Sequence, residues 1–214
     1  MAKNRNLINS VNLSFEMKCF EVLIKSYHSC LEIKRYSKDW EEKTFSSHLV
    51  SLMKVCKVAI GYNFTITKEE ELEDDEIDNG LKSAKKANPI DIRFHNIWNN
   101  LRLDYNVEAK NISASLWKKS IGSKVDASTQ QKEYIIEGID RFLTGHFKNK
   151  KGCMLGYLVN GELDDVISKV NAKIRSKKNK TETIILLTQT SNYSIFESTH
   201  SERTLKHLFF NFTI

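Results

Sequence analysis

The first third of the chain carries apolar residues at helical spacing. Between residues 14 and 36 neither glycine nor proline interrupts the pattern, which predicts one or two helices. A further helix is expected from Ser37 or Asp39, either of which can cap it, to about Ile60, just before Gly61. The apolar positions that mark the buried faces are Phe15, Cys19, Val22, Leu23, Leu31 and Ile33, followed by Phe45, Leu49, Leu52, Met53 and Cys56.

Beyond Gly61 the pattern changes to the alternation that is typical of strands. Residues 62–67, 90–94 and 103–112 alternate and are rich in β-branched and aromatic side chains. Asn99 and Asn100 separate the last two runs and suit a tight turn, so we expect a hairpin. The acidic stretch 69–76 has too few apolar residues for a core element, and we interpret it as an exposed loop, with metal binding as the alternative.

The second half of the chain switches between helix and strand. We predict a helix over residues 129–147, a strand covered on both faces over 153–159, and an amphipathic helix over 162–175. Three more strands are expected at 183–188, 193–196 and 205–212. This order of elements predicts an α/β fold with a mixed β-sheet flanked by α-helices.

Length and composition narrow the class of protein. The chain has 214 residues, 40% of them hydrophobic, which fits one compact domain. Within it we distinguish an N-terminal helical extension (1–38), a core (39–160) and a C-terminal helix with strands (161–214). The four cysteines are widely spaced and are interpreted as reduced core residues. Since no signal peptide and no membrane-spanning apolar window is recognisable, we expect a cytoplasmic protein without membrane contact.

Basic residues exceed acidic ones and gather in clusters. The chain has 33 Lys and Arg against 27 Asp and Glu, a formal charge of +6, which favours an anionic partner such as nucleic acid. Each cluster can contact several phosphates, or can be a solvated helix end or loop. The clusters are Lys82-Lys85-Lys86, Lys118-Lys119, Lys148-Lys150-Lys151 and the run 173–180, whose candidate nucleic-acid contacts are Lys173, Arg175, Lys177, Lys178 and Lys180.

Three charged residues fall inside the predicted hairpin. Asp91 lies within its first strand, and Glu108 and Lys110 stand two apart in the second, so the latter two project to the same face. A hairpin would bring Asp91 beside Glu108. Two adjacent carboxylates repel unless a cation neutralises them, which points to Mg²⁺ or Mn²⁺. The alternative is a Glu–Lys pair on the exposed face of an edge hairpin.

This spacing resembles the D…(D/E)-x-K signature of the PD-(D/E)xK nuclease superfamily. The similarity covers roughly residues 39–159, from a helix with Glu41-Glu42, through the hairpin, to a helix and a buried strand. The proline that often precedes the first aspartate is displaced, because Ile90 stands between Pro89 and Asp91. The resemblance implies a restriction-endonuclease-like core and metal-dependent hydrolysis of phosphodiester bonds, as in nucleases of bacterial anti-phage systems.

The resemblance also implies roles for individual residues. Asp91, Glu108 and the backbone carbonyl of Ala109 would hold the metal, and Lys110 would be the catalytic lysine. A glutamate of the preceding helix would complete the metal shell. Glu42 fits best, because it lies three residues before Phe45 on the buried face, while Glu41 is the alternative.

Two residues of the following predicted helix are further candidates for substrate contact. Tyr134 and Arg141 stand seven residues apart, close enough in phase to face the site together. The alternative places Tyr134 in the core and Arg141 at the surface.

Three functions are compatible with these patterns. The first is a DNA endonuclease in phage defence that acts with an ATPase or helicase subunit, since the chain shows no domain for target recognition or energy use. A homodimer would supply the two sites needed to cut both strands. The second is a catalytically silent nucleic-acid-binding module of the same fold, and the third is a nuclease for RNA or branched DNA.

Overall fold

The computed structural model describes residues 2–71, 89–98, 100–144, 147, 151–177, 182–201 and 203–213. The chain divides into two compact units: unit 1 comprises residues 1–35 and 46–106, and unit 2 comprises residues 36–45 and 107–214. Helix α2 (Glu42–Val55) and strand β3 (Leu101–Ser113) each begin in one unit and end in the other. None of the described helices is long and apolar enough to cross a membrane.

The strands confirm the predicted α/β class. They form a mixed seven-stranded sheet with helices beside it, in the order β1-β2-β3-β6-β9-β8-β7, and the more specific restriction-endonuclease-like fold stays a prediction. The bounds are β1 Thr65–Glu71, β2 Pro89–Trp98, β6 Gly152–Asn160, β7 Ile185–Gln189, β8 Tyr193–His200 and β9 Arg203–Asn211, with β3 as given above. Strands β2 and β3 are neighbours in the sheet and are joined by residues 99–100, as the predicted hairpin requires.

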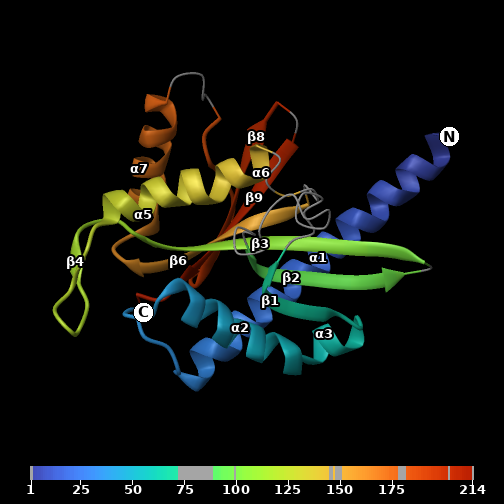
Figure 1. Cartoon of the computed structure of the whole chain (residues 1–214), viewed down its shortest axis with the longest axis horizontal. Helices are drawn as coiled ribbons and strands as arrows, with labels where there is room; N and C mark the ends of the chain where they lie inside the picture. Colours follow the sequence, from blue (N-terminus) through green and yellow to red (C-terminus); the bar gives the residue numbers. More distant parts are fainter. Residues whose placement is uncertain are drawn as a thin grey trace, which may run out of the picture. The chain divides into compact units, whose positions relative to one another are not determined.

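Unit 1 combines the long helix α1 (Ala2–Ile33), most of α2, the short α3 (Lys57–Gly61) and the antiparallel strands β1 and β2 (Figure 1). The stretch for which the sequence predicts one or two helices is a single helix, α1, which begins earlier than predicted. The rings of Phe15 and Phe64 pack edge to face at 5.2 Å, and the Tyr62 hydroxyl donates to Glu21 at 2.8 Å. An aromatic contact and a hydrogen bond therefore attach α1 to the segment before β1.

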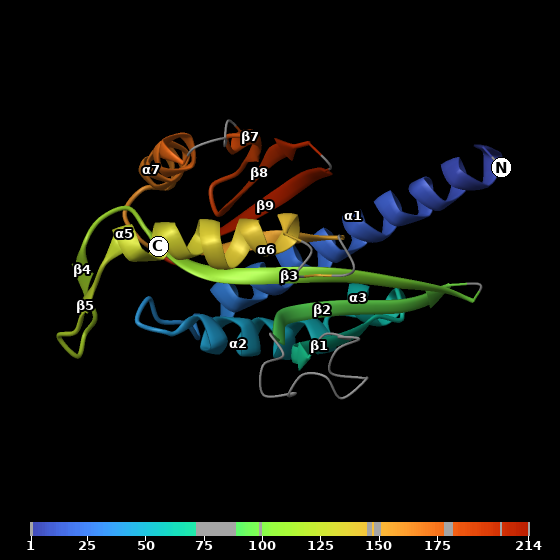
Figure 2. The same ribbon diagram turned by 45° about the horizontal axis from the view of Figure 1, so that its top comes forward.

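Unit 2 is built around β6, which is buried from Gly152 to Val159, as its uninterrupted apolar run predicts. Strand β9 pairs with β6 in parallel, and β8 is antiparallel to β9. One run of helix comprises α5 (Ala127–Glu133), the π-helical turn η2 (Tyr134–Ile139) and α6 (Asp140–Leu143). Helix α7 (Leu163–Ser176) packs beside α5, and Figures 1 and 2 show this pair next to the strands of unit 2.

Several predicted boundaries were wrong. Helix α2 begins at Glu42, so neither Ser37 nor Asp39 caps it: a turn joins the Ser37 carbonyl to the Trp40 N–H, and the Asp39 carboxylate accepts from the Ser120 N–H. The third helical run ends at Leu143 rather than at residue 147. Residues 69–71, which were predicted to be loop, belong to β1, where Glu70 and Glu71 pair with Ile90 and Pro89 of β2. The remainder of the acidic stretch, residues 72–76, lies outside the described residues.

Candidate active site

Glu108, Ala109 and Lys110 lie in the part of β3 that belongs to unit 2, and all three are buried. Glu108 is 1% exposed and Lys110 is 9% exposed. Because residues two apart in a strand share a face, the Lys110 ammonium reaches the Glu108 carboxylate and donates to its Oε1 at 2.8 Å. The alternative of an exposed Glu–Lys pair at a sheet edge is therefore wrong, since such charges would stay in water.

Three oxygen atoms converge on the nitrogen of Lys110. Besides Glu108 Oε1, the Lys110 Nζ donates to Glu42 Oε1 at 3.1 Å and to the Ala109 carbonyl at 2.9 Å. A buried charge is tolerated when opposite charges and hydrogen bonds compensate its loss of hydration. The ammonium supplies that compensation for two carboxylates at once.

Glu42 owes its position to the segment that precedes α2. The Asn111 side chain in β3 donates to the Trp40 carbonyl at 2.8 Å, which fixes the backbone two residues before Glu42. In the first turn of the helix, Phe45 is 1% exposed and stacks on Tyr157 of β6 with ring centroids 4.9 Å apart. These contacts direct Glu42, rather than Glu41, toward Lys110.

Arg141 of α6 adds a second cation. Its Nη1 donates to Glu108 Oε1 at 2.6 Å, and its Nη2 donates to Glu137 Oε2 at 2.7 Å. The residue follows the π-helical turn η2, a widened turn that shifts the phase of the helix and is frequent at functional sites. Arg141, with a side chain 22% exposed, thus stands between the buried Glu108 and solvent.

Glu42, Glu108 and the Ala109 carbonyl are suited to a hard divalent cation. Mg²⁺ and Mn²⁺ prefer carboxylate and carbonyl oxygens, and these are the oxygens that now share one ammonium. Within the described part of the chain, no group of three or more His, Cys, Asp or Glu side chains is placed to hold one metal ion. The donor set here consists of two carboxylates and one main-chain carbonyl, and it fits a metal that keeps several water ligands.

Asp91, the first acid of the predicted signature, lies in β2 of unit 1 and is half-buried between the fully buried Ile90 and Ile92. Glu42, Glu108, Lys110 and Arg141 all belong to unit 2. The predicted pairing of Asp91 with Glu108 therefore stays a prediction.

The structure separates Tyr134 from Arg141. Tyr134 is fully buried, and its hydroxyl hydrogen-bonds with Nδ1 of His207 at 2.9 Å. Burial raises the pKa of Tyr134 well above its usual value. In this structure its side chain has no surface from which to contact a nucleic acid, because the helix face that carries Tyr134 packs on β9, where its ring stacks on Phe209.

The predicted basic contacts at the end of α7 and directly after it are partly engaged within unit 2. Lys173 donates to the Ser128 hydroxyl at 2.8 Å, and Lys177 pairs with Asp140 at 3.3 Å, whereas Arg175 is exposed. Lys178 and Lys180 lie outside the described residues. The exposed end of α7 therefore presents Arg175 as its accessible cation among the described candidates.

Sequence reasoning missed Glu137 as the partner that steadies Arg141. The four-residue spacing of these two residues on a helix was a usable signal, since side chains at that spacing meet. It also missed the two-stranded hairpin formed by β4 (Trp117–Lys118) and β5 (Lys124–Val125), whose strands are too short for a periodic pattern.

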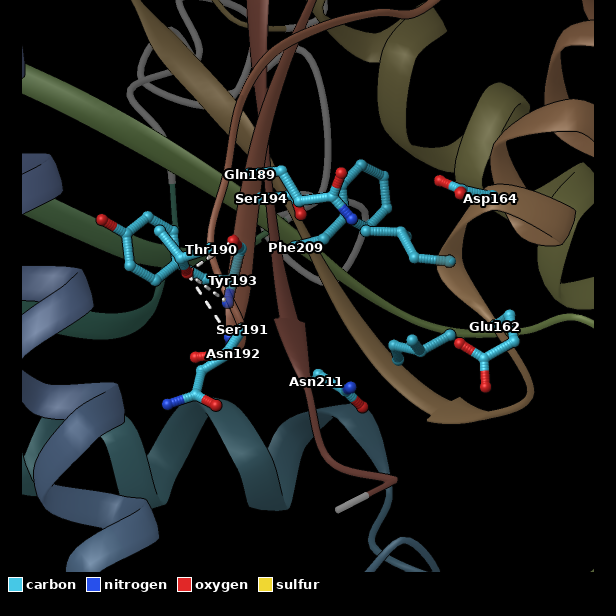
Figure 3. A pocket seen from close by; sticks show the side chains of 12 residues that line it. Glu162, Asp164, Gln189, Thr190, Ser191, Asn192, Tyr193, Ser194, Phe209 and Asn211 are labelled. Carbon is cyan, nitrogen blue, oxygen red and sulfur yellow. Dashed lines mark hydrogen bonds between the residues drawn. The ribbon is translucent and has the colours of Figure 1, made fainter.

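A separate pocket of about 140 Å³ lies at the turn between β7 and β8 and the start of α7 (Figure 3). Thr190 shapes the turn, since its hydroxyl donates to the Tyr193 carbonyl at 2.9 Å and accepts from the Tyr193 N–H at 3.1 Å. The acidic Glu162 and Asp164 face it from the other side. None of the residues of the Glu108 cluster lines this pocket.

No protein-family model, no curated protein and no solved structure matches the chain. A function is therefore inferred from the structure, starting from the cluster of Glu42, Glu108, Ala109, Lys110 and Arg141.

Proposed function

We propose that the chain is a Mg²⁺- or Mn²⁺-dependent endonuclease that hydrolyses phosphodiester bonds of DNA. One observation supports this proposal: Lys110 Nζ donates hydrogen bonds to Glu42 Oε1, Glu108 Oε1 and the Ala109 carbonyl. This arrangement places possible ligands of a hard cation next to a buried ammonium group. Soluble proteins rarely bury such charges in a sheet unless they serve a function.

In this proposal Glu42, Glu108 and the Ala109 carbonyl hold the metal, and Asp91 is the further acidic ligand expected from the sequence. When bound, the metal would polarise the scissile phosphate and make an attacking water more acidic. Lys110 orients that water and offsets the negative charge that develops on the phosphoryl oxygens.

Arg141 has two roles in the proposal. Its contact with Glu108 holds one carboxylate oxygen in place, and its guanidinium is also suited to a phosphate oxygen. Glu137 accepts from the other terminal nitrogen of the same guanidinium and keeps it near the site before substrate arrives. Arg141 would thus exchange a carboxylate partner for a phosphate partner on binding.

The cellular setting follows from the resemblance and stays a proposal. We propose a cytoplasmic nuclease of anti-phage defence that acts with an ATPase or helicase subunit and cuts both strands as a homodimer. A nuclease that acts on RNA or branched DNA, and a silent nucleic-acid-binding module, are the competing functions. The buried acid–lysine pair favours an enzyme over the silent module.

The direct test is incubation of the purified protein with single- and double-stranded DNA and RNA in Mg²⁺, Mn²⁺ or EDTA. We expect metal-dependent cleavage of DNA that falls roughly 10²-fold or more in Glu108→Ala and in Lys110→Ala, because each removes a group that acts on the transition state. Circular dichroism checks that both variants remain folded. Undiminished cleavage by both variants would overturn the site, and absence of cleavage by every form would favour the silent module.

A further inference from the structure

The β4–β5 hairpin extends away from the other strands of unit 2 in both views (Figures 1 and 2). Its strands pair Trp117 with Val125 and Lys118 with Lys124. The loop closes through hydrogen bonds from the Lys119 N–H to the Ser123 carbonyl and from the Gly122 N–H to the Lys119 carbonyl, and Gly122 has a φ of 86°. A turn followed by a residue in the left-handed region matches the right-handed twist of a hairpin, so this ribbon has a defined shape.

The two faces of the hairpin differ in character. Trp117 is 8% exposed and lies under the Lys38 ammonium, 5.7 Å from its ring centre. On the other face, Lys118 and Lys124 stand directly opposite each other and are both exposed. Like charges at directly opposed positions destabilise a strand pair. Residues 116–125 contain three lysines and no acidic residue, so nothing within the ribbon offsets this repulsion.

The tip of the hairpin exposes one large apolar side chain to solvent. Ile121 is 85% exposed, and Leu116 at the base is 62% exposed. An exposed isoleucine at the end of a cationic ribbon gains nothing for the fold of the chain. Single exposed apolar residues are common, so the charge of the ribbon points to its partner: exposed lysines that no acidic residue of the ribbon offsets favour an anionic surface.

The loop of the hairpin, between β4 and β5, is tied to the segment that leads into Glu42. The Asp39 carboxylate accepts from the Ser120 N–H at 2.9 Å, and hydrogen bonds from the side chain and then the backbone of Ser120 lower the pKa of Asp39. Lys119 forms an ion pair with Glu41, the residue next to Glu42. The ribbon is therefore held at a fixed place relative to the acid of the candidate active site.

We propose that the β4–β5 hairpin is a duplex-DNA contact that enters the major groove, with Lys118 and Lys124 on flanking phosphates and Ile121 toward the base edges. This inference rests on the proposed function and names the part of the chain that grips the substrate. The major groove of B-DNA admits a two-stranded ribbon, whereas that of A-form RNA is too narrow. Bound phosphates would relieve the repulsion between the two lysines.

The first experiment measures binding of a 20-base-pair DNA duplex in EDTA, where cleavage does not interfere, as a function of salt concentration. We expect the double variant Lys118→Ala/Lys124→Ala to reduce the slope of log K against log salt by about 1.8, since each lost phosphate contact removes about 0.9. The matched control is Lys54→Ala/Lys57→Ala, which removes two exposed lysines of unit 1 and should leave the slope near that of the wild type.

A second pair of variants separates charge from shape. Ile121→Ser should weaken duplex binding severalfold without a change of slope, because it removes an apolar contact and no charge. Lys118→Glu places an acidic group opposite Lys124, so it should raise or preserve the thermal midpoint while it weakens DNA binding more than Lys118→Ala does. Opposite effects on stability and binding are not expected of a residue that only shapes the fold.

The outcomes distinguish this inference from the proposed function. An unchanged salt slope in Lys118→Ala/Lys124→Ala would overturn the groove contact. So would an equal loss of affinity for duplex DNA, single-stranded DNA and duplex RNA in that variant. Either result would count against the hairpin even where Glu108→Ala still abolishes cleavage. Conversely, the expected slope change together with undiminished cleavage by Glu108→Ala would retain the hairpin contact and overturn the catalytic site. Failure of the wild-type protein to bind duplex DNA at any salt would overturn the hairpin proposal as well.

Discussion

At the scale of single residues, two adjacent glutamates have different surroundings. The Glu41 side chain is 76% exposed and pairs with Lys119, whereas the Glu42 side chain is 29% exposed and accepts from Lys110. The first contacts the loop of the β4–β5 hairpin, and the second begins helix α2, whose first turn is packed on β6 through Phe45. Glu41 and Glu42 are adjacent in the sequence but thus have different proposed roles.

We predict that Glu42→Ala lowers the rate of DNA cleavage roughly 10²-fold, because it removes one of the two carboxylates expected to hold the metal. Glu41→Ala is the matched control and should change the rate by less than about threefold, since an exposed ion pair contributes little. Single-turnover assays in Mg²⁺ measure both rates. Equal losses in the two variants would contradict the assignment of Glu42.

A second residue-scale feature is a buried polar chain. His207 is fully buried, with Nδ1 on the Tyr134 hydroxyl and Nε2 at 2.8 Å from the Ser198 hydroxyl, which also contacts His200. Burial lowers the pKa of His207 to about 3, and the nearby His200 adds to the effect. The imidazole is therefore neutral in the folded chain at neutral pH.

This lowered pKa predicts a loss of stability in mild acid. In the unfolded chain the histidine takes up a proton below about pH 6.5, while in the folded chain it stays neutral down to about pH 3, so protons favour unfolding in that window. Between pH 7 and pH 5 the contribution is about 2 kcal/mol. Urea unfolding at the two pH values should show this loss in the wild type and a smaller one in His207→Gln. An identical pH dependence would contradict the prediction.

At the scale of elements, the contact of β6 with β9 depends on a missing side chain. Gly156 of β6 is paired with Phe209 of β9, and a Cβ added at Gly156 would meet the ring of Phe209. That ring is 1% exposed and lies between Tyr134 and Phe196, with centroids 5.6 and 5.5 Å away. The Phe209 ring is therefore enclosed and cannot easily move away from an added Cβ.

We predict that Gly156→Ala destabilises the protein by about 1–3 kcal/mol, the usual effect of overpacking a core. Gly138→Ala is the matched control: a Cβ there would come closest to the end of the Met154 side chain, which is more flexible than a ring. The free energy of unfolding in urea compares the two variants. A loss at Gly138 as large as that at Gly156 would show that the rigidity of Phe209 is not the cause.

At the scale of the whole molecule, stability is linked to the charge of the candidate site. Glu108 is a buried carboxylate whose cationic partners are Lys110 and Arg141. Removal of one partner from a buried pair is destabilising by about 3–5 kcal/mol, because the remaining charge loses its compensation. A ligand that binds only the folded chain raises its stability by mass action.

Lys110→Met should therefore lower the thermal midpoint in EDTA, and Mg²⁺ should restore part of that loss by neutralising Glu42 and Glu108. At a concentration 100 times its dissociation constant, the ion contributes about 2.7 kcal/mol, or several degrees for a chain of this size. Differential scanning fluorimetry with and without Mg²⁺ measures the shift. The control Glu108→Gln/Lys110→Met should lose most of the response, and an equal response in both variants would place the ion elsewhere.

The hydrophobic pattern by itself determined the α/β class, the buried strand β6, the hairpin of β2 with β3, and the placement of Glu108 and Lys110 on one face of a strand. These features repeat over a few residues, so backbone geometry alone translates them into structure. Only the tertiary structure decided that Glu42 rather than Glu41 meets Lys110, that Arg141 reaches Glu108 while Tyr134 is buried, and that a short cationic hairpin is tied to residues 39–41. Those outcomes depend on contacts between residues far apart in the chain, on the phase shift of a π-helical turn and on a loop closed by Gly122, none of which has a local hydrophobic period.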